Sequence, residues 1–150
     1  MNHPVDPKGF IQINIVVRDI EAAARQWASL LGIPQPEVRT IRLEGGENYQ
    51  YRGRPETCGL RVCNIDMPGF MLELHEPAGG ESTFQEFLDK HGNGVHHIGF
   101  EVGSQRDSII EELAGAGYGM RTVGIYPGSS WTIVDSEDVL GVNLNIKPVR

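Results

Sequence analysis

The sequence predicts an α+β fold in which two tandem β-α-β-β-β units form one domain. Two observations carry this prediction: apolar and polar residues alternate along strand-like segments, and the pattern occurs twice. Residues 10–17 and 95–102 each form such a segment, and each is followed by an apolar stripe with helical spacing. A shift of 85 residues carries Gln12 onto His97 and superimposes the glycines that end the two helices. Duplication of one supersecondary unit explains the pattern.

The first unit is predicted to span residues 10–77, after an N-terminal tail of residues 1–9. Asp19 is placed to cap the helix that follows the first strand, and Gly32 ends that helix. The polar stretch 44–55 has no apolar period, so we expect a long hairpin loop that could act as a lid. Further strands are predicted at residues 38–43, 60–65 and 70–75, with Pro77-Ala78-Gly79-Gly80 breaking the last of them.

A connector of residues 78–94 leads to the second unit, residues 95–147. Ser82 and Gln85 have the spacing of a capped helix start, and the short helix is expected to end near Lys90. The second unit repeats the order of the first. Its strands are predicted at 95–102, 120–123, 131–134 and 142–146, with a helix that begins between Ser104 and Asp107 and stops at Gly117.

Charge and composition exclude several classes of partner. The chain has 150 residues and a formal net charge of −7, with no cluster of Lys and Arg, so we expect no binding to nucleic acid. No apolar run is long enough to cross a membrane, and residues 1–7 lack the pattern of an export signal, so a cytoplasmic protein is expected. The spacing of Cys58 and Cys63 matches no metal or redox motif, which favours two reduced structural thiols.

Four of the predicted strands have one apolar and one polar face. An antiparallel sheet with a hydrated outer face would produce the same alternation. A hydrated face usually carries Lys, Thr, Arg and Glu, whereas these strands present groups that can converge on one ligand or metal ion. The polar positions are Gln12, Asn14, Glu73, His75, His97, Asn143 and Asn145.

These segments resemble the vicinal oxygen chelate superfamily, which includes glyoxalase I, methylmalonyl-CoA epimerase, extradiol dioxygenases and bleomycin-resistance proteins. The resemblance covers residues 10–146, and its most specific segments are 12–19, 72–77, 94–100 and 135–146. The connector 87–92 before the His-His pair is most similar to the epimerase branch. The resemblance implies the glyoxalase/bleomycin-resistance fold, in which paired units curve into a cup and the first and last strand of each unit supply one metal ligand apiece.

Carried over to this chain, the four ligand positions fall on Gln12, Glu73, His97 and Asn145, and they imply a divalent ion such as Co, Ni, Mn, Mg or Zn. Asn145 departs from the family pattern, because glyoxalase I and the epimerases are expected to have Glu there as ligand and base. An amide cannot accept a proton near neutral pH. Glu73 and His75 therefore become the candidate catalytic residues. Glu44 and Glu47 are interpreted as solvated loop charges, and His96 as a structural residue on the opposite face from His97.

The resemblance implies a metal-assisted enzyme that moves a proton on the carbon next to a carbonyl. An isomerase of the racemase or epimerase type comes first, with a thioester or an isoflavanone-like ketone as substrate, and a glyoxalase-type lyase comes second. A metal-free binding protein of the bleomycin-resistance type is the alternative from a different class. The resemblance also implies a homodimer. The substrate-binding candidates are Asn14, Tyr49, Tyr51, Trp131 and Asn143.

Overall fold

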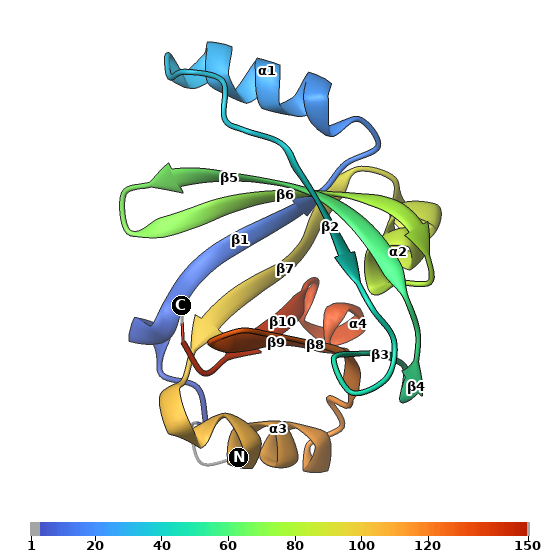
Figure 1. Cartoon of the computed structure of the whole chain (residues 1–150). Coiled ribbons are helices and arrows are strands. Elements are labelled where there is room, and N and C mark those ends of the chain that lie inside the picture. Colours follow the sequence, from blue (N-terminus) through green and yellow to red (C-terminus); the bar gives the residue numbers. More distant parts are fainter. Residues whose placement is uncertain (1–3, 150) are drawn as a thin grey trace.

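The computed structural model describes residues 4–149, which form one mixed sheet of ten strands together with helices (Figure 1). The strand order is β2-β5-β6-β1-β7-β10-β9-β8-β3-β4. The strands are β1 (Phe10–Val16), β2 (Arg39–Leu43), β3 (Tyr49–Tyr51), β4 (Arg54–Pro55), β5 (Cys58–Met67), β6 (Phe70–Gly80), β7 (Gly94–Glu101), β8 (Met120–Tyr126), β9 (Ser129–Val134) and β10 (Asn143–Lys147). The helices are α1 (Ile20–Leu31), α2 (Thr83–His91), α3 (Arg106–Gly115) and α4 (Glu137–Leu140), with 3₁₀ turns at Pro7–Gly9 and Gly103–Gln105.

The order of the strands repeats about the centre of the sheet. In each half the first strand pairs in parallel with the last, β1 with β6 and β7 with β10. The two first strands, β1 and β7, pair antiparallel to each other and join the halves. The predicted α+β class with paired β-α-β-β-β units is therefore confirmed, and the strands that carry the polar positions lie side by side in the middle of the sheet.

The helix signals are confirmed in α1 and α2. The Asp19 carboxylate accepts a hydrogen bond from the Ala22 amide, and Gly32 ends α1 with a positive φ of 64°. Ser82 caps α2 by accepting from the amide of Gln85. The predicted capped start of the third helix is wrong. A 3₁₀ turn leads into α3 instead, and no side-chain hydrogen bond caps it.

The segment predicted as a loop at residues 44–55 contains a small hairpin, β3–β4. Strand β3 pairs with β8 of the other half, and Tyr49 lies opposite Gly124. Because β2 and β3 are near opposite ends of the strand order and only five residues join them, the sheet must curl until its two ends meet (Figure 1). This segment is therefore a structural link across the cup, and the loop prediction is wrong for it.

Strand β6 also differs from its prediction, because it runs on to Gly80 through the segment expected to break it. Pro77 and Gly80 both pair with β5, opposite Leu60 and Cys58. At Gly80 the backbone has a φ of 75°, and a Cβ there would overlap the Thr57 carbonyl oxygen. Glycine thus lets the two strands stay paired, rather than ending the pairing.

Apolar side chains pack in three clusters around the sheet. One lies beneath α1 and contains Ile20, Ala24 and Leu74. A second joins α3 to the second half. The third connects α2 with the β3 hairpin and β5, and it includes Phe84 and Tyr49. Helix α1 covers the outer face of the first half and α3 lies on the outer side of the second (Figure 1). Cys58 and Cys63 are buried free thiols.

Candidate functional site

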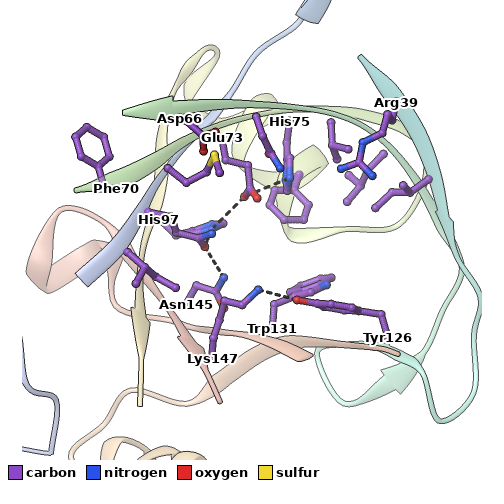
Figure 2. Close-up of a pocket in the computed structure, with 18 of the residues that line it drawn as sticks. Arg39, Asp66, Phe70, Glu73, His75, His97, Tyr126, Trp131, Asn145 and Lys147 are labelled. Carbon is purple, nitrogen blue, oxygen red and sulfur yellow. Dashed lines mark hydrogen bonds and ion pairs between the residues drawn. The ribbon is translucent and has the colours of Figure 1, made fainter. Parts of the chain in front are cut away.

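The inner, concave side of the sheet encloses a cavity of about 820 Å³ (Figure 2). Strands from both halves supply its wall, which follows from the curl of the sheet. Apolar side chains, among them Ile41, Leu43, Leu60, Val62, Phe84 and Trp131, form one part of the wall. The polar part includes Gln12, Glu73, His75, His97, Asn145 and Lys147. All four predicted metal-ligand positions are thus brought to one cavity from β1, β6, β7 and β10.

Three of these side chains form a hydrogen-bonded group. Gln12 Oε1 accepts a bond from Asn145 Nδ2 at 2.7 Å and lies 3.2 Å from His97 Nε2. All three residues are buried. The amide oxygen of Gln12 is therefore held between the two halves of the sheet.

The orientation of Asn145 is set by the neighbouring strand. Its side-chain oxygen accepts a hydrogen bond of 3.0 Å from the backbone amide of Thr132. A backbone N–H can only donate, so the oxygen must face Thr132 and the NH₂ group must face the cavity side. Asn145 therefore presents a hydrogen-bond donor where the resemblance implies a metal ligand.

Glu73 has one engaged carboxylate oxygen and one free one. Its Oε1 accepts from Asn14 Nδ2 at 2.9 Å and lies 3.3 Å from His75 Nε2 and 3.8 Å from His97 Nε2. Within residues 4–149, Oε2 has no hydrogen-bond partner, and the side chain is 18% exposed. Two neighbours thus fix the carboxylate while leaving an oxygen free to act on a ligand. Glu44 lies away from the cavity and pairs with Arg42 at the surface.

Three buried histidines in or beside the cavity are held neutral. Burial lowers the pKa of His75, and the nearby Glu73 carboxylate offsets only part of this effect. Burial also lowers the pKa of His96 and of His97 well below the usual value. His75 Nε2 lies 3.3 Å from Glu73 Oε1, and within residues 4–149 its buried Nδ1 has no hydrogen-bond partner.

His96 is not a lining residue of the cavity, and it links His97 to α2. The pairing of β1 with β7 shifts register at His96, so its ring contacts that of His97 instead of pointing to the opposite face as predicted. The rings of His96 and His97 approach with their Nδ1 atoms 2.8 Å apart, and His96 Nε2 lies 3.0 Å from the Thr83 hydroxyl. Arg121 Nη1 donates to Thr83 Oγ1 at 3.5 Å, which leaves the hydroxyl hydrogen for His96. His96 then donates to His97, and His97 donates from Nε2 to Gln12. In the opposite tautomers, His97 donates from Nδ1 to His96, and His96 donates from Nε2 to the Thr83 hydroxyl. The Nε2 lone pair of His97 is then free for a metal ion.

Of the five predicted substrate-binding residues, Trp131 alone lines the cavity. Asn14 and Asn143 are fully buried behind it, where Asn14 holds Glu73 and Asn143 donates to the backbone oxygen of His96. Tyr49 is buried in the core and donates to the Glu81 carbonyl. The hydroxyl of Tyr51 donates to Glu86. The two tyrosines therefore pack the hairpin, and neither reaches the cavity wall.

Several cavity residues were missed by the sequence prediction, among them Lys147 and Tyr126. Lys147 lies two residues after Asn145 on β10, so period-two alternation already places both on one face. Tyr126 is the last residue of β8 and gives no comparable signal.

The donor set fits a divalent ion through three residues. His97 Nε2 lies 3.2 Å from Gln12 Oε1 and 3.8 Å from Glu73 Oε1, close to the spacing of about 3 Å between neighbouring ligands of one cation. Residues 4–149 contain no group of three or more His, Cys, Asp or Glu side chains arranged to hold a metal. Any centre here therefore depends on the amide oxygen of Gln12 as its third ligand.

A family model described as "Glyoxalase/Bleomycin resistance protein/Dioxygenase superfamily" matches residues 11–134, most of the chain. The chain belongs to this superfamily. Members commonly bind a divalent metal ion, as the predicted resemblance to vicinal oxygen chelate proteins also implies. No curated protein sequence matches the chain.

Solved structures with the superfamily fold include methylmalonyl-CoA epimerases. The enzyme from Mycobacterium tuberculosis has a TM-score of 0.60 and 20% identity, with 95% of this chain and 88% of that chain covered. A variant of the Streptomyces coelicolor epimerase, in complex with 2-nitronate-propionyl-CoA, has a TM-score of 0.58 and 20% identity, with 92% of both chains covered. A hypothetical protein from Bacillus halodurans C-125 has a TM-score of 0.60, also at 20% identity, with 92% of this chain and 91% of that chain covered. These likenesses show the fold. No helix within residues 4–149 has the length and apolar character needed to cross a membrane.

Proposed function

We propose that this protein is a proton-transfer enzyme that acts on the carbon next to a carbonyl, as a racemase or epimerase. The observation that carries the proposal is the Glu73 carboxylate, held at one oxygen by Asn14 and His75 and free at the other. A general base needs a fixed position and an oxygen within reach of the substrate proton. The superfamily fold with epimerase neighbours supports this reaction class.

In the proposed reaction, the C–H bond next to the carbonyl breaks and its proton passes to Glu73 Oε2, while the electron pair moves to the carbonyl oxygen as an enolate. The NH₂ group of Asn145 donates one hydrogen to Gln12 and has a second hydrogen to donate to that oxygen. The proton then leaves Glu73 and re-forms a C–H bond. Because the carboxylate is fixed, the centre inverts when the planar enolate turns its opposite face toward Glu73 before the proton returns. His75 and Asn14 keep the carboxylate aimed throughout.

A divalent ion would be held by Gln12, Glu73 and His97 and would supply Lewis-acid stabilisation of the enolate oxygen. These residues contribute one formal negative charge, from Glu73. A site with a single carboxylate holds its ion less tightly than one with two, but leaves more of the positive field for the substrate.

The test is exchange of the substrate α-proton with heavy water, followed by NMR with propionyl-CoA, methylmalonyl-CoA and dihydrodaidzein as trial substrates. The wild-type protein should exchange the proton of at least one. Glu73→Gln keeps the shape and should lower the rate by roughly 10²-fold to 10⁴-fold, the usual contribution of a general base. The surface variant Glu44→Gln is the matched control and should exchange at the wild-type rate. Exchange that survives in Glu73→Gln would remove Glu73 from the mechanism.

The second candidate function, a metal-free binding protein that sequesters a small molecule, has one observation in its favour. Gln12, His97 and Asn145 satisfy one another with hydrogen bonds. They can therefore serve as a wall for a ligand without any ion. Tight ligand binding without exchange of any α-proton would favour this function.

A further inference from the structure

Lys147 places a buried ammonium group at the wall of the cavity. Its side chain comes from β10 and the residue is 8% exposed. The Nζ atom donates to the Tyr126 hydroxyl at 2.7 Å and lies 5.3 Å from the centre of the Tyr126 ring. Figure 2 shows Lys147, Tyr126 and Trp131 on the same side of the cavity.

Lys147 makes no ion pair within residues 4–149. The comparison with Arg121, another buried cation of the same half, is informative. Arg121 is 4% exposed and pairs with two carboxylates, Asp135 and Glu137. A buried charge is costly unless an opposite charge compensates it. Tyr126 offers Lys147 only a neutral oxygen and a ring, so a negative partner is missing on the cavity side.

We propose that Lys147 and Tyr126 form the binding site for an anionic group of the ligand, a carboxylate or sulfonate, whose apolar body lies in the cavity against Trp131. The proposal deepens the proposed function, on which it rests only in taking this cavity as the substrate site. Within residues 4–149, no other Lys or Arg of the wall is buried. Arg39 and Arg42 also line the cavity, but both are exposed to solvent.

The strand geometry orients the ligand. Lys147 and Asn145 are successive residues on one face of β10, so both side chains line the same part of the cavity wall. A substrate whose carbonyl oxygen meets Asn145 should therefore extend toward Lys147 and Tyr126 with its acidic group. Such a substrate is an organic acid whose acidic group is separate from the reacting carbonyl.

The experiment compares two fluorescent dyes with the same aromatic skeleton. 1-Anilinonaphthalene-8-sulfonate carries a sulfonate, and N-phenyl-1-naphthylamine is neutral. Fluorescence titration of the Lys147→Met variant should show at least a tenfold loss of affinity for the sulfonate dye, with the neutral dye bound within twofold of wild type. Lys8→Met, at an exposed lysine outside the cavity, is the matched control and should bind both dyes as wild type does. Lys147→Arg keeps the charge and should retain most of the affinity for the sulfonate.

Unchanged binding of the sulfonate dye to Lys147→Met would overturn the proposal, and so would an equal loss of both dyes. A loss that occurs in Arg39→Met instead would move the anion site to the mouth of the cavity. A competition on wild-type protein needs no variant: 1-naphthoic acid should displace the sulfonate dye at least tenfold better than 1-naphthamide, and equal displacement would contradict an anion site. Dye binding is independent of proton exchange, so the two proposals can fail separately.

Discussion

Gln12 can lie across the centre of the site because residue 99 on the neighbouring strand is glycine. The two residues face each other in the antiparallel pair of β1 and β7, and a Cβ on Gly99 would overlap the Cγ, Cδ and Oε1 atoms of Gln12. The absence of a side chain at position 99 thus fixes where the Gln12 oxygen sits. His97 and Asn145, which both contact that oxygen, depend on it in turn.

Gly99→Ala should therefore displace Gln12 and damage the site more than the fold. Overpacking of this kind costs about 1–3 kcal/mol of unfolding free energy. The α-proton exchange rate should fall by about tenfold or more, because a loss of about 1.4 kcal/mol of transition-state stabilisation lowers a rate tenfold. Gly115→Ala is the control: it lies in α3 with open space around it, and it should gain up to about 1 kcal/mol without changing the rate. A normal exchange rate in Gly99→Ala would contradict this role of Gly99.

At the scale of elements, the β3–β4 hairpin determines how the cup closes. It leaves the first half, pairs with β8 of the second half, and sends Tyr49 and Tyr51 into the cluster that includes Phe84. Phe84 is on α2 and also lines the cavity. The hairpin therefore supports the wall of the cavity from behind.

Tyr49→Phe separates this structural role from substrate binding. The variant loses the hydrogen bond to the Glu81 carbonyl and should lose about 1 kcal/mol of unfolding free energy in urea denaturation. Its affinity for the naphthalene dyes should remain within twofold of wild type, because the ring keeps its place outside the cavity. Trp131→Leu provides the contrast, since it removes part of the wall and should weaken both dyes. A loss of dye affinity in Tyr49→Phe would return Tyr49 to the binding site.

At the scale of the whole molecule, the curled sheet buries three histidines, and burial favours their neutral form. His96 and His97 lie between the cavity and α2, and His75 lies against Glu73. Burial lowers the pKa of each below the value of about 6.5 that it has in the unfolded chain. Below that pH the unfolded state binds more protons than the folded state, so the free energy of unfolding must fall as the pH falls.

Urea denaturation of metal-free protein between pH 7.5 and 5.5 should therefore show stability that is constant above pH 7 and decreases below about pH 6.5. Each neutral histidine contributes up to about 1.4 kcal/mol per pH unit to the slope. Carboxylates contribute little in this window, because they titrate near pH 4 in the unfolded chain. His96→Gln should show a shallower slope. A flat profile would mean that the histidines become charged in the folded protein.

The sequence by itself determined the features that depend on local pattern. The cap at Asp19, the polar face that carries Gln12 and His97, and the α+β class follow from periodicity and helix signals, which need only neighbouring residues. The resemblance then indicated the superfamily and assigned four metal-ligand positions to one site.

The tertiary structure alone decided which atoms face the cavity. The Asn145 oxygen turns to Thr132, Tyr49 turns into the core, and Lys147 turns toward Tyr126, each through a partner on a different segment of the chain. Such contacts depend on how the ten strands are ordered and how far the sheet curls. Residues far apart in the chain determine both the strand order and the curl. Alternation along one strand could therefore show that Lys147 shares a face with Asn145, but not which residues each of them contacts.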